Sequence, residues 1–185
     1  MPSQFEVKGK VIAITGGGGV GIGYAAAELL VSQGAKVSIA DISDKTLQEA
    51  ESKLKAASPS GEYMTAVVDV RKPEQVDDWI RRTVEKFGKL DGAVNMAGVI
   101  PKNINIDRVE DMPDADWQFV IDVNLNGVMH CMRAQIKNMN EKGSIVNASS
   151  VAGIRGFAKN AAYTAAKASY PYSLIVHVLT SDSTE

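Results

Sequence analysis

Short hydrophobic runs alternate with longer amphipathic stretches along this chain. Runs rich in β-branched residues predict strands at 11–15, 36–41, 63–70, 90–96 and 143–149. Between them, apolar residues recur at helical spacing, most clearly after Pro73, where one face collects Val76, Trp79, Ile80, Val84 and Phe87. Gly88 ends that pattern. The alternation predicts an α/β fold, a doubly wound parallel sheet whose ligands bind outside the carboxyl ends of the strands.

A glycine-rich segment, TGGGGVGIG at 15–23, follows the first predicted strand. Glycines let the backbone approach a pyrophosphate, and the N–H groups that begin the next helix attract its charge. The alternative is a loop that is merely flexible. The segment fits G-x-G-x-x-G from Gly16 and also G-x-x-x-G-x-G at Gly17, Gly21 and Gly23, so the loop alone does not decide its register.

Asp41 ends the second predicted strand. An acidic side chain there accepts hydrogen bonds from an adenosine ribose and repels a 2′-phosphate. No lysine or arginine lies between Gly16 and Tyr24, so the pattern favours NAD over NADP as the cofactor. The alternative is that Asp41 only caps the helix expected to begin near Asp44.

Composition narrows the class of protein. A chain of 185 residues with 45% hydrophobic content predicts one globular domain. The net charge of −2 and scattered basic residues favour neither nucleic acid nor a membrane surface as a partner. The single cysteine, Cys131, excludes an internal disulfide framework, and we find neither a signal peptide nor an apolar run of about 20 residues. We therefore expect a cytoplasmic protein.

Tyr163 and Lys167 stand four residues apart in YTAAKAS, so both lie on one face of a helix. An ammonium group beside a tyrosine stabilises the phenolate, which can exchange a proton with an alcohol. Such a pair alone is commonly a surface pair. Ser150 at the end of the fifth strand strengthens the catalytic interpretation.

Asn124 lies within an apolar helical stripe, which we predict to contain Trp117, Val120, Ile121, Val128, Met129 and Met132. Burying an amide without partners costs about 1–3 kcal/mol, so Asn124 requires backbone, water or a functional network. Gly127 would permit a local bend with an ordered water. The alternative is a plain core asparagine satisfied by the backbone.

In this order the motifs resemble the short-chain dehydrogenase/reductase family, from about Lys10 to Lys167. They are the glycine loop, Asp41, DV at Asp69 and Val70, NMAG at 95–98, NLNG at 124–127, VNASSVAG around Ser150, and YTAAK. The resemblance implies a Rossmann fold and hydride transfer between NAD(H) and a secondary alcohol or ketone.

The resemblance also implies a role for each matching catalytic residue. Tyr163 would be the acid/base, and Lys167 would bind the nicotinamide ribose and favour the phenolate. Ser150 would orient the substrate oxygen, and Asn124 would anchor a water in the proton relay.

On the cofactor side, the resemblance implies the register Gly17, Gly21 and Gly23, with Ile22 among the binding residues. Asp69 and Val70 would contact adenine, while Asn95, Ala97 and Gly98 would form the wall beside the adenosine ribose. The alternative for Asp69 is a strand-end residue that leads into the helix at Pro73.

Two departures from the family pattern lie near the cofactor. The family motif is T-G-x-x-x-G-x-G, so this register leaves Gly16 where threonine is expected. We expect the extra residue to be absorbed near Thr15 and Gly16. Met96 replaces the second asparagine of N-N-A-G, which removes one polar group between neighbouring strands.

A third departure follows Lys167, where the family continues a long helix and further strands but this chain reads ASYPYSLIVHVLTSDSTE. Pro171 ends the predicted helix. The resemblance thus implies an NAD(P)-binding domain at 1–170 that lacks the family's last strands, and a divergent tail at 171–185. Within that tail, 173–180 is β-prone, and we expect it to add beside the fifth strand after a short crossover.

The shortened end leaves two hypotheses. One is an active oxidoreductase on a small alcohol or ketone; the other is a truncated, non-catalytic nucleotide-binding fragment. Family members form homodimers or tetramers through the helices that carry Asn124 and Tyr163, an assembly that a short second helix would weaken. His130, His177 and Cys131 give no metal-ligand spacing, and no G-x-S-x-G elbow or G-x-x-x-x-G-K-[ST] loop is present.

Overall fold

The computed structural model describes residues 6–169 and 175–177. Strands and helices alternate as predicted. In chain order the elements are β1 (Val11–Thr15), α1 (Ile22–Ser32), β2 (Lys36–Asp41), α2 (Asp44–Ala57), β3 (Tyr63–Val67), α3 (Pro73–Phe87), β4 (Leu90–Asn95), the 3-10 turn η1 (Val109–Asp111), α4 (Asp114–Ile121), the π-helical turn η2 (Asp122–Asn126), α5 (Gly127–Lys137), β5 (Met139–Asn147), the 3-10 turn η3 (Val151–Gly153), α6 (Ala161–Ala168) and β6 (Ile175–His177).

The strands form one sheet in the order β3-β2-β1-β4-β5-β6, in which β1 to β5 are parallel. The chain moves outward from β1 to β3 and then returns to place β4 on the other side of β1. Such a reversal opens a crevice between the carboxyl ends of β1 and β4, where ligands of doubly wound sheets bind. The predicted fold class is confirmed.

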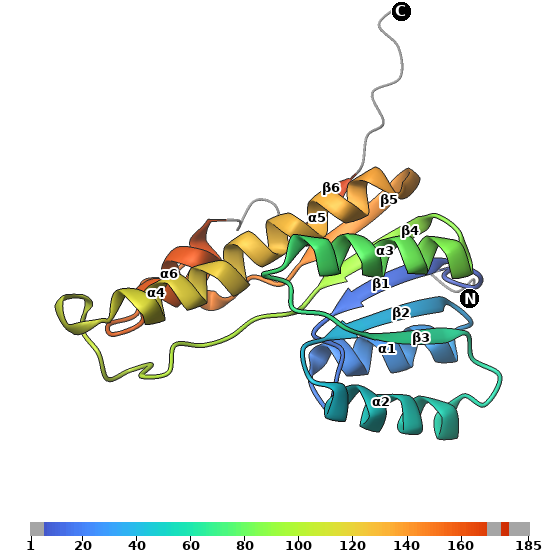
Figure 1. Ribbon diagram of the computed structural model, residues 1–185, viewed down its shortest axis with the longest axis horizontal. Coiled ribbons are helices and arrows are strands. Elements are labelled where there is room, and N and C mark those ends of the chain that lie inside the picture. The colour runs from blue at the N-terminus through green and yellow to red at the C-terminus, as the bar shows by residue number, and fades with distance from the viewer. Residues whose placement is uncertain (1–5, 170–174, 178–185) are drawn as a thin grey trace, which may run out of the picture.

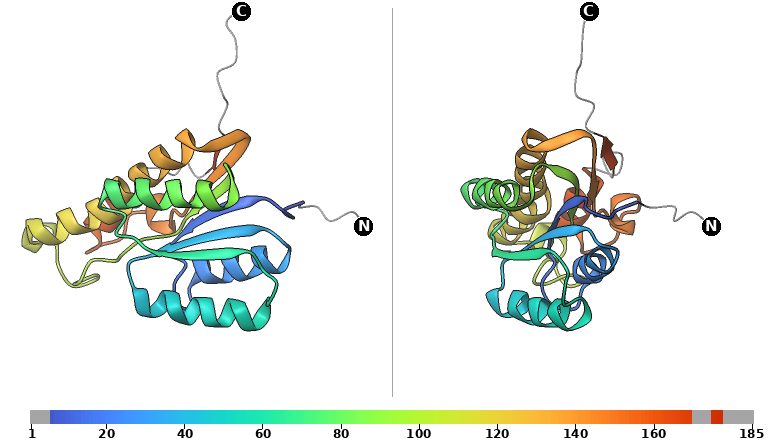
Figure 2. Two further views of the ribbon diagram at one scale, coloured as in Figure 1. Left: turned by 45° about the vertical axis from the view of Figure 1, so that its right-hand side comes forward. Right: turned by 90° about the vertical axis from the view of Figure 1, so that its right-hand side faces the viewer.

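Helices cover both faces of the sheet (Figure 1). Core residues of α1 and α2 pack on one face, and those of α3 and α5 pack on the other. Two further views show the sheet between these helix layers (Figure 2). The predicted stripe of α3 is confirmed, because Val76, Trp79 and Ile80 are fully buried and Gly88 follows the last helical residue. The end that carries α4 and α6 extends away from the sheet (Figure 1).

Three of the predicted strands had wrong boundaries. The third strand ends at Val67 rather than Val70: the N–H of Val68 makes a last hydrogen bond to the carbonyl of Asp41, and the chain then leaves the ladder. The fourth ends at Asn95, one residue early. The fifth spans 139–147 rather than 143–149, since Met139 pairs with Leu90 across a register shift. The segments after β3, β4 and β5 are thereby free to line a site.

The tail adds beside β5, as predicted, over Ile175–His177. It runs antiparallel to β5, so the expected crossover was wrong: a crossover would have returned the chain in the parallel direction. The remaining residues of the predicted strand, and Pro171, lie outside the described residues. Among the helices of the described ranges, none has the length and apolar character needed to cross a membrane.

Candidate functional site

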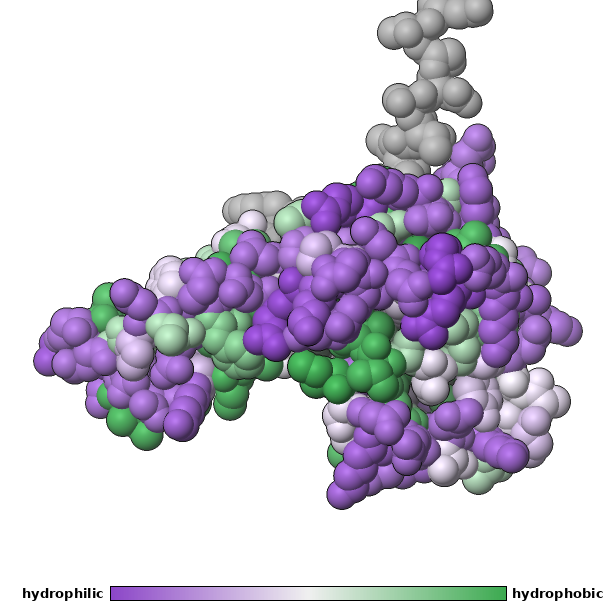
Figure 3. All heavy atoms as spheres, in the orientation of Figure 1, coloured by the Kyte–Doolittle hydropathy of each residue, from purple (hydrophilic) through white to green (hydrophobic). Residues whose placement is uncertain are grey.

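Two adjoining cavities, of about 240 and 600 Å³, lie at the carboxyl ends of the parallel strands. They share four lining residues, Met96, Gly98, Val99 and Phe119. Figure 3 shows hydrophobic surface in the recess between the end that carries α4 and the side that carries α2. The cavities thus form one cleft. Their combined volume lies in the usual range of about 300–1,000 Å³ for small-molecule sites.

Gly16 occupies a tight corner of the cleft. Its φ is +67°, and an added Cβ would lie 2.7 Å from the backbone nitrogen of Ala97. Directly before it, Thr15 remains in unbroken register with Ala40 and Asn95. The ladder itself therefore does not absorb the extra loop residue by a register shift at Thr15, and the place of that residue in the loop stays a prediction.

The other loop glycines have different surroundings. An added Cβ would lie 2.5 Å from Ile39 at Gly17 and 2.2 Å from the carbonyl oxygen of Gly16 at Gly23, so both positions need glycine for packing. At Gly21 it would meet no described atom within 4 Å. Gly21 precedes α1, whose N-terminus has neither a side-chain cap nor an acidic residue in its first turn. That open, positively polarised helix end suits a phosphate group.

Asp41 lines the smaller cavity and binds two backbone segments. One carboxylate oxygen accepts from the N–H of Gly18 at 3.0 Å, and the other from the N–H of Ser43 at 3.1 Å. The alternative of a helix cap was wrong, because Ser43 is the N-cap of α2 and accepts from the N–H of Thr46. Asp41 is therefore placed between the glycine loop and the cavity.

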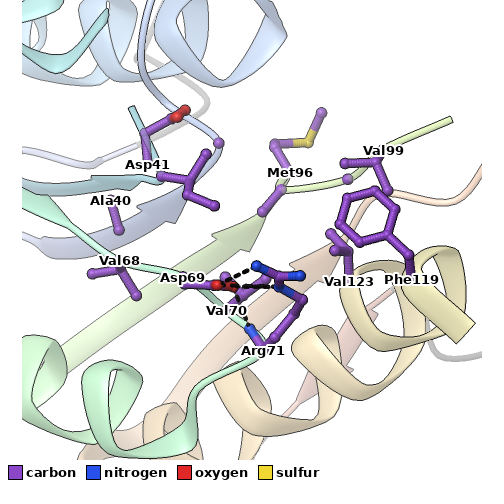
Figure 4. Close-up of a pocket in the computed structure, with 14 residues that line it drawn as sticks. Ala40, Asp41, Val68, Asp69, Val70, Arg71, Met96, Val99, Phe119 and Val123 are labelled. Atoms are coloured by element: carbon purple, nitrogen blue, oxygen red, sulfur yellow. Dashed lines mark hydrogen bonds and ion pairs between the residues drawn. The ribbon is translucent and has the colours of Figure 1, made fainter. Parts of the chain in front are cut away.

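Asp69 and Val70 line the same cavity, as does Arg71. Figure 4 shows Asp69 and Arg71 joined beneath Met96, with Asp41 and Phe119 on opposite sides. The Arg71 guanidinium donates to both Asp69 oxygens, at 2.9 and 2.6 Å, and lowers the pKa of Asp69 below its ordinary value. The guanidinium also lies 5.3 Å from the ring centroid of Phe119. Arg71 thus joins the end of β3 to α4.

Ala97 and Gly98 line the cleft, but Asn95 does not. The Asn95 side chain is 2% exposed and hydrogen-bonds to Gln135 and Asn147. The Asn95 side chain therefore does not reach the cleft, and a contact between Asn95 and an adenosine ribose stays a prediction. As the last residue of β4 it faces α5, and its amide ties this strand to β5 and to that helix.

Asn124 is fully buried in the π-helical turn that precedes Gly127. Its Oδ1 accepts from the N–H of Val99 at 2.8 Å, and its Nδ2 donates to the carbonyl of Val99 at 2.7 Å. This turn ends directly before Gly127, and the local bend with an ordered water expected there stays a prediction. The amide is satisfied by backbone, as one alternative held, but that backbone is part of the cleft.

The predicted stripe around Asn124 was wrong in part. Trp117 and Met129 are 39% and 45% exposed, whereas Val120 and Val128 are buried. A π-helical turn inserts one residue and rotates everything that follows it around the helix axis. Apolar positions before and after the turn therefore do not share one face, which a regular 3.6-residue period cannot anticipate.

Tyr163 and Lys167 both line the larger cavity from α6, and Ile22 lines it from the start of α1. The Lys167 ammonium lies 5.7 Å from the centroid of the Tyr163 ring, so the predicted shared face is confirmed. Lys167 is 5% exposed, and burial lowers its pKa from 10.5 to about 8. Its Nζ donates to the carbonyl of Ala148 at 2.7 Å.

Gly98 brings the catalytic candidates together. A Cβ added there would lie 2.9 Å from Oδ1 of Asn124 and 3.7 Å from Nζ of Lys167. Residues from the end of β4, from η2 and from α6 therefore meet at the junction of the two cavities. The cleft therefore combines two features. Its open helix N-terminus can bind the phosphates of a dinucleotide, and its polar centre can exchange a proton.

Comparison with known proteins assigns this arrangement to a family. Residues 10–172 match the short chain dehydrogenase family. The chain belongs to that family. A short-chain dehydrogenase/reductase, aba4, of Botryotinia fuckeliana is 46% identical over 162 residues, which are 85% of this chain and 60% of the relative. Levodione reductase of Leifsonia aquatica is 38% identical over 160 residues, 85% of this chain and 58% of that protein.

Solved structures agree with the family assignment. The crystal structure of levodione reductase has a TM-score of 0.81 at 36% identity, covering 87% of this chain and 62% of that one. NAD+-bound xylitol dehydrogenase has a TM-score of 0.79 at 30% identity, covering 89% and 62%. The chain thus spans about three fifths of the length of the relatives that it matches. It is an oxidoreductase-family chain with the family's nucleotide-binding fold.

Ser150 is not among the residues that line the cleft, whereas its neighbour Ser149 is. The Ser150 hydroxyl accepts from the N–H of Ala152 at 3.2 Å and begins η3. Ser149 donates to the carbonyl of Lys167 at 3.0 Å. Gly16, Arg71 and Ser149 line the cleft but were not predicted from the sequence. Each is adjacent in the sequence to a predicted site residue, and that adjacency was the signal that could have found them.

Other chemistries find no support in the described ranges. Histidine, cysteine and acidic side chains there form no group that could hold a metal ion. Burial raises the pKa of the Cys131 thiol to about 12, which keeps it protonated and unreactive.

Proposed function

We propose that this chain binds NAD(H) in the cleft and promotes hydride transfer between NAD(H) and a small secondary alcohol or ketone, with Tyr163 as the acid/base. The observation that carries the proposal is the continuous cleft from Asp41 to Tyr163 and Lys167. Bound NAD(H) would supply or accept the hydride. Because the chain spans three fifths of its relatives, the activity of a whole family member is part of the proposal.

The protein side of the cleft fits a dinucleotide. The open α1 N-terminus at Gly21 suits the pyrophosphate, because the absence of a side chain at Gly21 leaves space beside the helix end. Asp41 would accept from the adenosine ribose hydroxyls and disfavour a 2′-phosphate, which supports NAD over NADP. Asp69, Val70 and Arg71 would contact the adenine.

The catalytic side supplies the proton chemistry. Tyr163 would give a proton to a carbonyl oxygen or take one from an alcohol. With a pKa of about 8, Lys167 is mostly cationic at neutral pH, and its charge beside the ring would stabilise the phenolate. Ser150, which directly follows the cleft-lining Ser149, would orient the substrate oxygen. Asn124, next to Gly98 and Lys167, would hold the backbone of Val99 in place beside the proton relay.

Two relatives support this choice of chemistry. Levodione reductase carries a reductase name, and the xylitol dehydrogenase structure holds NAD+. Exposed Trp117, Phe119 and Met129 on α4 and α5 favour a homo-oligomer built through these helices.

The test is turnover by the purified chain. We expect NADH absorbance at 340 nm to fall with at least one member of a panel of cyclic and linear ketones, and Tyr163→Phe to abolish the decrease. NADH binding without turnover across that panel and the reverse alcohol panel would instead indicate a nucleotide-binding fragment. Absence of NADH binding would overturn both.

A further inference from the structure

Asp41 holds the glycine loop to the start of α2. We infer that Asp41 is a positioning residue for the pyrophosphate-binding loop, in addition to its proposed contact with the adenosine ribose. This inference rests on the proposed NAD(H) function. It assigns the two carboxylate oxygens a structural task that is complete before any nucleotide arrives.

The contacts join two segments that are far apart in the chain. Oδ2 of Asp41 accepts from the N–H of Gly18, in the loop before α1, and Oδ1 accepts from the N–H of Ser43, which begins α2. Since each oxygen serves a different segment, one carboxylate connects the loop to the helix start. A carboxylate oxygen has a second lone pair, so ribose hydroxyls can still bind.

The loop also touches α2 directly. The N–H of Gly19 donates to the carbonyl of Thr46 at 3.1 Å. A Cβ at Gly18 would lie 2.5 Å from Oγ1 of Thr46 and 2.9 Å from Cγ of Asp41. Thr46 is itself held by the Ser43 cap, at 3.3 Å. We call these contacts among Gly18, Gly19, Asp41, Ser43 and Thr46 the loop latch.

The loop latch explains how a lengthened loop leaves the helix end open. Within the loop, Gly19 adopts a φ of +82°. A longer loop has more conformations and can fold over the first turn of α1. Because the latch ties its middle to α2, Gly21 keeps open space at the α1 N-terminus. A preorganised loop binds its ligand with less entropic cost.

A nucleotide without ribose hydroxyls separates this role from ribose recognition. We would titrate 2′,3′-dideoxyadenosine 5′-diphosphate, and ADP, into wild type and Asp41→Asn by calorimetry. Removing a negative charge favours a polyanion, so electrostatics alone predicts tighter binding of the dideoxy ligand. The two N–H groups bind different oxygens of Asp41, and asparagine replaces one of these oxygens with an NH2 donor, so one contact is lost. The latch therefore predicts binding at least about fivefold weaker. The two accounts differ in sign.

Asp44→Asn is the matched control. It removes the same charge three residues away, from an exposed carboxylate that accepts only from the Gln48 side chain among the hydrogen bonds of the described residues. We expect it to bind the dideoxy ligand as wild type does or more tightly. Gly18→Ala attacks the latch from the other side while keeping the Asp41 charge, and we expect it to weaken both ligands.

Amide hydrogen exchange of the ligand-free protein gives a readout that needs no nucleotide. We expect the Gly18 and Gly19 amides to be protected in wild type and Asp44→Asn, and to exchange faster in Asp41→Asn. Equal exchange in wild type and Asp41→Asn, or unchanged or tighter dideoxy-ligand binding by Asp41→Asn, would overturn the inference. Protected amides in a wild type that binds neither ligand would refute the NAD(H) function and the positioning role with it.

Discussion

The nucleotide half of the molecule, residues 11–98, and the catalytic half, residues 99–169, are held together differently. In the nucleotide half, unbroken parallel pairing places the loop, and Asp41 then fixes it through Gly18 and Ser43. In the catalytic half, Asn124 holds Val99 across 25 positions of sequence, and no strand from 99 to 138 supports that contact.

The difference indicates how far nucleotide binding and catalysis depend on separate parts of the molecule. The nucleotide half has its own ladder, and neither core cluster includes a residue of α6, so this half can present a cofactor site without α6. Within the catalytic half, β5 and α5 belong to the sheet and its helix layer, whereas α4 and α6 extend away from the sheet (Figure 1). We therefore expect substitutions to separate into those that affect nucleotide affinity and those that affect turnover.

The largest effect is expected for Tyr163→Phe, which removes the proposed acid/base without removing the ring. Loss of positioned proton transfer typically lowers rates by about 10²–10⁴-fold. We expect kcat to fall by that order while NADH affinity measured by calorimetry stays within about twofold. A variant that retains kcat would refute the role of Tyr163, and one that loses NADH affinity would break the separation of the halves.

Gly21→Ala tests the nucleotide half in the same way. The added methyl meets no described atom, so the melting temperature should hardly change. It enters the space where the pyrophosphate would approach the backbone, and we expect NADH affinity to fall about tenfold or more. Gly156→Ala is the control, since its added Cβ also meets no described atom within 4 Å and should leave affinity unchanged. Equal NADH affinity for Gly21→Ala and wild type would place the pyrophosphate elsewhere.

Asn124→Ala sharpens the comparison from the catalytic side. It leaves the Val99 N–H and carbonyl without their side-chain partner, which costs about 1–3 kcal/mol of unfolding free energy. Urea denaturation would measure that loss, and Gln118→Ala, which removes an exposed bond to Asp122 one helix turn earlier, should cost much less. Similar losses for the two variants would show that the Val99 contact does not stabilise this half.

The last prediction concerns the pH dependence of stability. Burial lowers the pKa of Lys167 from 10.5 to about 8, so between these values the unfolded chain binds a proton that the folded chain has lost. Unfolding free energy therefore rises with pH across that window, whereas below pH 8 this contribution is constant. We expect wild type to gain stability relative to Lys167→Met from pH 8 to 10. A difference that is constant with pH would contradict a buried, shifted lysine.

The sequence predicts most of what is local. Tyr163 and Lys167 share a cavity because a spacing of four fixes one helix face, and Asp41 lies in the cleft because strand ends meet at one edge. Where the loop begins was not predictable, because counting glycines does not reveal that Thr15 stays in the ladder.

Orientation at strand ends and the phase of a distorted helix needed coordinates. Asn95 ends β4 yet faces α5, and Ser149 rather than Ser150 lines the cleft, because a single residue's shift reverses which side a chain presents. The π-helical turn at Asn124 likewise changes the phase of the helix that follows it, where Met129 is exposed, and no residue pattern in that stretch marks the insertion.

Calorimetric titration of NADH and NADPH into the wild-type chain and Tyr163→Phe tests the central claim most directly. The claim is that the nucleotide half forms an NAD(H) site that does not depend on the catalytic set. We predict saturable binding of one NADH per chain, with equal affinity in both proteins, and binding of NADPH at least about tenfold weaker. No saturable NADH binding, or NADPH binding as tight as NADH, would contradict it.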